Sequence, residues 1–335
     1  MFKQELLYTQ NDFDGIKKME GFLPDKIFDA HAHLFDSTFL PNTLEPGRER
    51  FVLDAAAYRK EMMPMLGNPK ELRINGIIFP DKGMGDLSSG LLQQSDRFLA
   101  EQLEEEPTWV GEIIVHPKET AEDIEKRLIH PNIRGFKCYH LLADREGTFD
   151  ANIGEYLPES AWEVANKRKM VITLHMVKEE ALANEDNMNY ICSMAKKYPD
   201  AVLILAHAAR SFAAWTGIEN VEKLAHIENV CFDFSAICET PAMFQIVKKA
   251  GIKRCMWGSD YPVCRGRGKA ISIADSFYWI YENDINNFSS KTPVRNWLIG
   301  IEGLAAARQL SILADLTEGD IEDYFFNNAM RLFYR

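Results

Sequence analysis

Short apolar runs alternate with amphipathic stretches along most of this chain, and no other sequence feature constrains the fold as strongly. Eight such runs occupy residues 26–33, 73–79, 108–115, 133–139, 170–175, 201–207, 230–236 and 254–260. Stretches with helical spacing lie between most of them, at 90–106, 159–168, 187–198 and 241–251. Because the runs are apolar almost throughout, they are typical of parallel strands that helices cover on both faces.

Eight alternating units favour a closed (β/α)8 TIM barrel over an open doubly wound sheet. We expect one α/β domain over residues 1–335 with a short N-terminal extension. A long first connection over residues 34–72 is expected to contain a polar loop and a helix around 51–66. Residues 261–335 read mostly as helices, including 320–333, and extend beyond the eighth strand. Long connections at the carboxyl end of the strands are expected to cover the active site.

The charge and the ends of the chain exclude several classes of protein. The 50 acidic and 38 basic residues give a net charge of −12, which argues against binding to nucleic acids or to anionic membranes. A few basic side chains can nevertheless hold a small anion. The charged N-terminal stretch lacks the pattern of a signal peptide, and no transmembrane segment is expected. The six cysteines form no CxxC motif, so we expect reduced thiols and a cytoplasmic protein.

Histidines gather at the ends of the predicted strands. His31 and His33 end the first run, His175 the fifth, His207 the sixth and Asp260 the eighth. Residues i and i+2 of a strand share a face, so His31 and His33 point the same way. One such histidine alone is more often structural, but the coincidence at four strands predicts a metal site at the carboxyl end of the barrel.

Six segments carry a resemblance to a known family. They are FDAHAH (28–33), GFK (135–137), ITLH (172–175), LAHAAR (205–210), WGSDYP (257–262) and NNAMRLF (327–333). Together they resemble the amidohydrolase superfamily, in particular the amidohydrolase 2 branch. That branch includes aminocarboxymuconate-semialdehyde and resorcylate decarboxylases as well as hydrolases of unknown substrate. The segments follow the family order over nearly the whole chain.

The resemblance implies a role for each matching residue. The expected ligands of one divalent metal are His31, His33, His175 and Asp260. His207 would be a second-metal ligand or a general acid/base. Lys137 stands where binuclear members carry a carbamylated lysine that bridges two metals, although a free lysine there would bind a substrate carboxylate. We expect Zn²⁺, with Mn²⁺ or Fe²⁺ as alternatives, and one or two ions. By analogy alone, the protein is expected to form a homodimer.

Two reactions are compatible with this set of residues. In a hydrolase, Asp260 would take a proton from a metal-activated water as it attacks a C–N, C–O or lactone bond. In a non-oxidative decarboxylase, His207 would protonate the carbon that loses its carboxylate. A binding protein without catalysis is disfavoured because the set of potential ligands is complete.

Other side chains are candidates for binding a small, anionic substrate. Arg210, in the loop after the sixth run, is suited to hold a carboxylate or phosphate through two hydrogen bonds. Arg265 lies in a glycine-flanked loop that would grip an anion, and Tyr139 and His140 are expected to line the pocket. The alternatives are a surface ion pair, a solvated loop and simple packing. Asp29 is expected to orient a ligand or to cap a turn.

Overall fold

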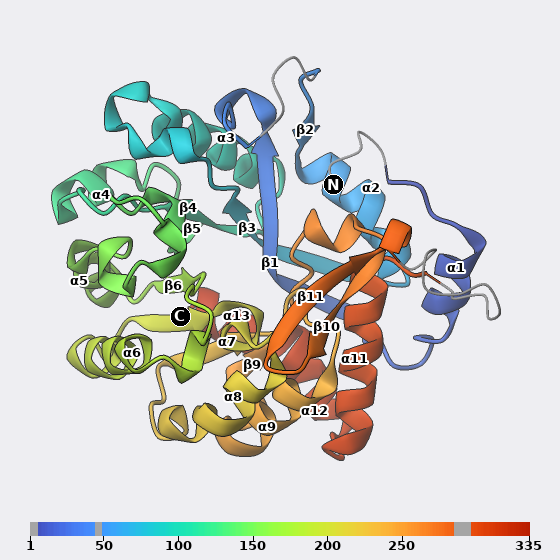
Figure 1. The fold of residues 1–335 in the computed structure, drawn as a ribbon. Coiled ribbons are helices and arrows are strands. Elements are labelled where there is room, and N and C mark those ends of the chain that lie inside the picture. The colour runs from blue at the N-terminus through green and yellow to red at the C-terminus, as the bar shows by residue number, and fades with distance from the viewer. Residues whose placement is uncertain (1–5, 44–48, 285–295) are drawn as a thin grey trace.

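The computed structural model describes residues 6–43, 49–284 and 296–335. Figure 1 shows a ring of helices around a central set of parallel strands. The strands are β1 (Lys26–Asp36), β3 (Glu71–Ile78), β4 (Val110–Ile114), β5 (Ile133–Cys138), β6 (Val171–Leu174), β7 (Val202–Leu205), β8 (Val230–Asp233) and β9 (Cys255–Met256). Each pairs in parallel with the next, which confirms the eight predicted strands and their order.

The barrel closes where the chain after β9 returns to β1. Ala30 N donates to Trp257 O at 3.0 Å, Asp260 N to His31 O at 2.8 Å, and His33 N to Tyr261 O at 2.7 Å. These bonds fix the segment that carries Asp260 beside the strand that carries both histidines.

The helices predicted from apolar spacing are present as α3 (Leu91–Glu105), α5 (Glu159–Arg168), α6 (Glu185–Lys197) and α9 (Thr240–Ala250). Their ends follow local chemistry. The Asn184 side chain caps α6 by accepting from Asn187 N, and α9 begins with a proline in its first turn and stops at Gly251, which has a φ of 83°. The described residues also form the helices α1 (Gln10–Lys17), α2 (Ala55–Met65), α4 (Ala121–Arg127), α7 (Ala206–Arg210), α8 (Ala214–Asn220), α11 (Ile299–Leu313), α12 (Glu318–Glu322) and α13 (Asn328–Phe333).

The first connection contains the expected helix, α2, whose N-terminus the Asp54 side chain caps. It also contains β2 (Val52–Leu53), which was not predicted and which pairs antiparallel with the end of β1. Residues 44–48 of the expected polar loop lie outside the described residues.

The segment after β9 departs from the prediction. Instead of helix, residues 268–281 form a hairpin of β10 (Gly268–Ile273) and β11 (Ser276–Tyr281). The aromatic and β-branched content of 276–281 was the available signal. Residues 285–295 of this segment lie outside the described part. The helix expected over 320–333 is interrupted by a π-helical turn at Asp323–Asn327.

An apolar plug closes the amino end of the barrel. Phe28 stacks on Phe333 of α13 with ring centroids 5.4 Å apart, and Phe326 and Ala329 pack into the same cluster. This cluster contains residues near the amino ends of the strands, including Val110, Val171, Val202 and Cys231. Apolar side chains therefore fill the amino end of the barrel. Across the described residues, no helix has the length and apolar character needed to cross a membrane.

Candidate active site

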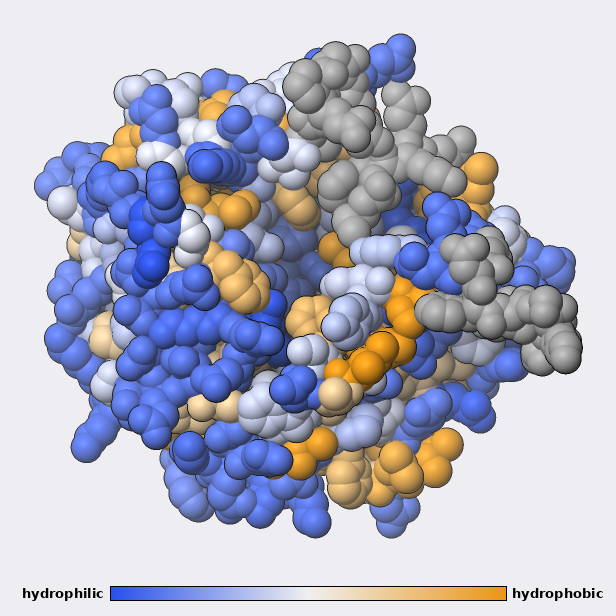
Figure 2. All heavy atoms as spheres, in the orientation of Figure 1, coloured by the Kyte–Doolittle hydropathy of each residue, from blue (hydrophilic) through white to orange (hydrophobic). Residues whose placement is uncertain are grey.

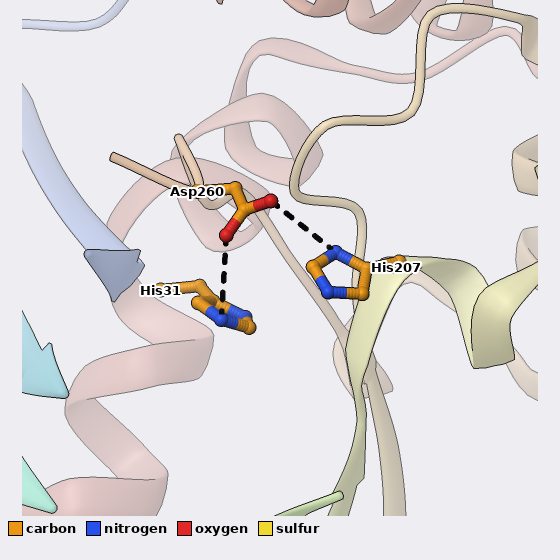
Figure 3. A group of neighbouring side chains, drawn as sticks. All are labelled: His31, His207 and Asp260. Atoms are coloured by element: carbon orange, nitrogen blue, oxygen red, sulfur yellow. Dashed lines mark ion pairs between the residues drawn. The ribbon is translucent and has the colours of Figure 1, made fainter. Parts of the chain in front are cut away.

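Histidine and aspartate side chains from β1 and from the segments that follow β7 and β9 meet at the carboxyl end of the barrel (Figure 3). The Nε2 atoms of His31 and His33 lie 3.3 Å apart. Asp260 Oδ1 lies 3.7 Å from His31 Nε2 and 3.6 Å from His33 Nε2, and Asp260 Oδ2 lies 4.0 Å from His207 Nδ1. All four residues are buried. Asp260 is thus shared between the histidines of β1 and the histidine that follows β7.

His175, at the end of β6, lies beside this group. Its ring centroid is 5.2 Å from that of His207 and 4.3 Å from that of Tyr139, with which it stacks. Among the described residues, one potential ligand atom from each of His31, His207 and Asp260 lies within 4.8 Å of the other two. The structure thus places His207 beside His31 and Asp260, at the position where the resemblance implied a second-metal ligand or a general acid/base.

Lys137 enters the same space from β5. Its Nζ atom lies 3.2 Å from His31 Nε2, and its side chain is completely buried. Burial lowers the pKa of Lys137, although nearby Asp233, Glu112 and Asp260 partly counteract this effect.

Burial sets the charge of the group. It lowers the pKa of His31, His33 and His175 well below the usual range and lowers that of His207 to about 3, so these imidazoles are neutral. Burial also raises the pKa of Asp260 to about 7, against the opposing effect of Lys137. Neutral imidazoles and a carboxylate are the form in which these groups ligate Zn²⁺, Mn²⁺ or Fe²⁺, so the donor set fits a divalent cation.

The backbone around His207 is unusual. The segment labelled α7 is a left-handed turn, because His207, Ala208, Ala209 and Arg210 have φ values of 57°, 53°, 58° and 57°. Asp260 also has a positive φ, at 55°. Each left-handed residue other than glycine costs roughly 1–2 kcal/mol, and such strain gathers at functional sites. The turn brings both His207 and Arg210 to one pocket.

A pocket of about 280 Å³ opens above the group. Figure 2 shows the molecule hollowed near the centre of this face, beside apolar surface over the β10–β11 hairpin. The lining residues are His33, Phe79, Pro80, Tyr139, His175, His207, Arg210, Phe212, Asp260, Val263, Phe277, Trp279 and Tyr281. The hairpin strand β11 supplies three of the aromatic walls. It is held against the barrel by the stacking of Phe277 on Phe212 at 5.0 Å.

Arg210 is placed as the sequence suggested. Its guanidinium lies 4.8 Å from the ring centre of Phe149 and 5.4 Å from that of Phe277, and its NH1 group donates to Lys178 O at 3.2 Å. Among the described residues it forms no ion pair, so most of its donors are left for a ligand. Tyr139 lines the same pocket.

Arg265 and His140 do not line this pocket. Arg265 is buried beside α2, where its Nε lies 2.9 Å from Glu61 Oε2, and Glu61 also accepts from Tyr261 at 2.8 Å. This internal ion pair explains why Arg265 does not face the site. His140 stacks on Tyr139, and its Nδ1 lies 3.1 Å from Thr148 Oγ1.

Several polar residues around the site were missed from the sequence. Asp233 and Ser235 of the β8 segment contact both His31 and His207. Glu112 of β4 accepts from Asn75 and Thr173 inside the barrel, and burial raises its pKa to about 7. A signal existed in each case, because each is a polar residue in an otherwise apolar run.

Asp29 connects the two strand ends that close the barrel. Its Oδ1 accepts from His31 N at 3.0 Å and from Ser259 N at 2.8 Å, and its Oδ2 accepts from the Tyr58 hydroxyl at 2.7 Å. The carboxylate thus fixes the backbone of His31 relative to the segment that carries Asp260.

Imidazoles and a carboxylate at the carboxyl end of a (β/α)8 barrel define a TIM-barrel protein with a candidate metal centre. The amidohydrolase 2 family model, described as amidohydrolase, matches residues 28–335, and the chain belongs to this family. A search of curated protein sequences finds no significant match.

Solved structures share the fold at low sequence identity. An amidohydrolase from Burkholderia multivorans with bound zinc has a TM-score of 0.60 and 13% identity, covering 92% of this chain and 99% of its own. A putative 2-pyrone-4,6-dicarboxylic acid hydrolase from Pseudomonas putida has a TM-score of 0.56 and 14% identity, covering 92% and 97%. The 5-carboxyvanillate decarboxylase from Sphingomonas paucimobilis has a TM-score of 0.55 and 12% identity, covering 92% and 99%. Hydrolases and decarboxylases are thus both among its structural neighbours.

Proposed function

We propose that this protein is a metal-dependent hydrolase that uses an activated water to cleave a C–N, C–O or lactone bond of a small anionic molecule. The observation that carries the proposal is the position of Asp260, which lies between His31, His33 and His207 and faces a pocket that contains Arg210. Membership of the amidohydrolase family supports the same class of enzyme.

The proposed ligands are His31, His33 and Asp260, completed by His175 or His207. Zn²⁺ is the expected ion, with Mn²⁺ or Fe²⁺ as alternatives, and a second ion would require Lys137. When bound, such a cation polarises a substrate oxygen and lowers the pKa of water.

The protein's own groups supply binding and proton transfer. Asp260 is suited to accept a proton from the attacking water, because its pKa of about 7 before loading is near neutral pH. Arg210 would hold a substrate carboxylate through its planar guanidinium, which Phe149 and Phe277 keep oriented. Tyr139, Phe212 and Trp279 would cover the substrate and exclude bulk water.

The second candidate is a non-oxidative decarboxylase of a small unsaturated or aromatic carboxylate. The aromatic walls of the pocket favour a flat substrate, and His207 would protonate the carbon that loses its carboxylate. Against this, burial lowers the pKa of His207 to about 3, which leaves it without a proton to give at neutral pH. Nearby Asp233 and the hydrogen bond to the Ser235 carbonyl counteract this effect only in part, so we favour hydrolysis over decarboxylation.

One screen separates the two reactions. The purified protein, loaded with Zn²⁺ or Mn²⁺, is incubated with lactones, amides and aromatic or unsaturated carboxylates, with separate detection of CO2. We expect a hydrolysis product without CO2 and one or two bound ions per chain. Release of CO2 with the ring or chain intact would establish the decarboxylase instead. A protein that binds no metal and gains no activity from added ions would overturn both.

We further propose that residues 1–335 act as one domain in the cytoplasm, with a small molecule as the partner. The six cysteines are free, which suits a reducing compartment. A homodimer is proposed by analogy, and sedimentation of the purified protein would test it.

A further inference from the structure

The carboxylate of Asp233 contacts two of the site histidines at once. Its Oδ2 lies 3.0 Å from His31 Nδ1. Its Oδ1 accepts from His207 N at 3.2 Å, from Ser235 N at 3.1 Å and from the Ser235 hydroxyl. Asp233 is fully buried, so both of its oxygens are committed to these partners.

The hydroxyl of Ser235 extends this arrangement. Its hydrogen is donated to Asp233, so its oxygen can only accept from the imidazoles, which lie 2.9 Å away at His207 Nδ1 and 3.2 Å away at His31 Nδ1. His207 Nδ1 also lies 3.1 Å from the carbonyl oxygen of Ser235, which is an acceptor only. The hydrogen atom of a neutral His207 must therefore be on Nδ1.

The hydrogen-bond partners of His31 also determine which of its ring nitrogens carries the hydrogen. Its Nδ1 faces the Asp233 carboxylate and the Ser235 oxygen, both of which accept. Its Nε2 faces the Lys137 ammonium, which is a donor only, at 3.2 Å. A neutral His31 with its hydrogen on Nδ1 satisfies every one of these contacts, whereas the opposite tautomer conflicts with all of them.

We propose that Asp233, together with Ser235, is a positioning residue that holds His31 and His207 in the Nδ1–H tautomer and so leaves the lone pair of His31 Nε2 facing the site. The inference rests on the proposed function only in that His31 Nε2 is the atom that would bind the metal. Outer carboxylates that orient metal-binding histidines are a general feature of metal sites, and their loss weakens metal binding by about 10- to 100-fold.

The substitution Asp233→Asn tests this geometry because it changes almost no volume. Three donors surround Oδ1, so the oxygen of the new amide would stay there and its NH2 group would face His31 Nδ1. That nitrogen would have to become an acceptor. A neutral His31 would then carry its hydrogen on Nε2 and lose the lone pair that binds the cation.

The experiment measures tautomers and zinc affinity separately. Nitrogen-15 NMR of the metal-free protein with labelled histidine reports which ring nitrogen carries the hydrogen. We expect Nδ1–H for His31 and His207 in the wild type, and Nε2–H for His31 in D233N. The affinity for Zn²⁺, measured by chelator competition, should fall by about 10- to 100-fold in D233N.

Two controls make the result specific. Asp81 is also fully buried and accepts from Asn42 and Thr43 outside the site, so D81N should keep the wild-type zinc affinity. Should D233N fail to fold, the wild-type spectrum still decides the question. An Nε2–H tautomer of His31 in the wild type, or wild-type zinc affinity in folded D233N, overturns the proposal. A wild-type protein that binds none of Zn²⁺, Mn²⁺ and Fe²⁺ would overturn the proposed function, while the tautomers would still be read from the metal-free spectrum.

Discussion

The ammonium nitrogen of Lys137 lies 3.2 Å from Nε2 of His31, the atom proposed to bind a metal. Both side chains are completely buried, so water screens the contact little. A lysine that remains free would therefore repel a cation bound by His31. A carbamylated lysine would carry a negative charge and attract it.

The substitution Lys137→Met distinguishes these two states. We expect zinc affinity to rise about tenfold or more, because like unit charges about 4 Å apart repel by about 4 kcal/mol at an effective dielectric constant of about 20. Chelator competition measures the change, and substitution of the exposed Lys126 is the matched control. A fall in affinity, or the loss of a second ion, would instead identify a carbamylated lysine.

Removal of a proposed ligand should remove metal and activity together. His31→Asn and Asp260→Asn are each expected to lower the bound zinc and to reduce kcat/KM by at least about 100-fold, since the site loses a ligand or its proton acceptor. Elemental analysis and assay of the same preparations provide the measurement. His226 is exposed and is not one of the proposed ligands, so His226→Asn should retain both the bound zinc and the activity. Equal activity in all three variants would refute the assignment.

Metal binding should weaken in mild acid. Burial raises the pKa of Asp260 to about 7, so below that pH Zn²⁺ must displace a proton from the carboxyl group. The four histidines have lowered pKa values and remain neutral there. We therefore expect zinc affinity to fall by about tenfold per pH unit below about pH 7. An affinity that is flat from about pH 6 to about pH 8 would contradict this.

The raised pKa of Asp260 also contributes to the stability of the metal-free protein, and this contribution should increase, rather than decrease, as the pH falls. Because the folded state holds the Asp260 proton more tightly than the unfolded state, this group stabilises the fold at low pH. Its contribution is lost as the pH rises through about 7. Denaturant unfolding of metal-free wild type and D260N across this range would reveal the difference as a loss of pH dependence in the variant.

Arg210 should govern the affinity for anionic substrates. Arg210→Met removes the guanidinium between Phe149 and Phe277, and a charge-assisted hydrogen bond is worth about 1.5–3 kcal/mol, so KM should rise by about 10- to 100-fold. Arg210→Lys should recover little of this loss, because lysine offers no planar pair of donors. The exposed Arg308 is the control. An unchanged KM for carboxylate substrates would exclude this role.

The hairpin should select substrates by shape. Successive residues of a strand point to opposite sides, and Trp279 lines the pocket while its neighbour Tyr278 is 55% exposed. Trp279→Ala should raise KM and admit bulkier substrates with little change in kcat, whereas Tyr278→Ala should change neither. Steady-state kinetics over a series of substrates of increasing size provides the test, and identical profiles for the two variants would contradict it.

Local pattern was sufficient for the barrel. The apolar runs that end in His33, His175 and His207 contain the predicted strands. Because both faces of a parallel sheet are buried, nearly every residue of such a strand is apolar, and the sequence shows this directly. The same reasoning placed His31 and Asp260 at one end of the barrel, and the family resemblance added Lys137; the structure brings the three together. The reasoning from local pattern missed the β10–β11 hairpin, whose residues form a wall only by packing on Phe212.

The sequence by itself determined the strand order, the helices between the strands and the end of the barrel at which the polar groups gather, because these follow from periodicity and from the geometry of βα units. Only the tertiary structure decided that Asp233 contacts both His31 and His207, that Arg265 is paired with Glu61, and that a left-handed turn carries Arg210 into the pocket. These relationships join residues far apart in the chain or depend on backbone angles. The distances that define them exist only once the barrel has closed.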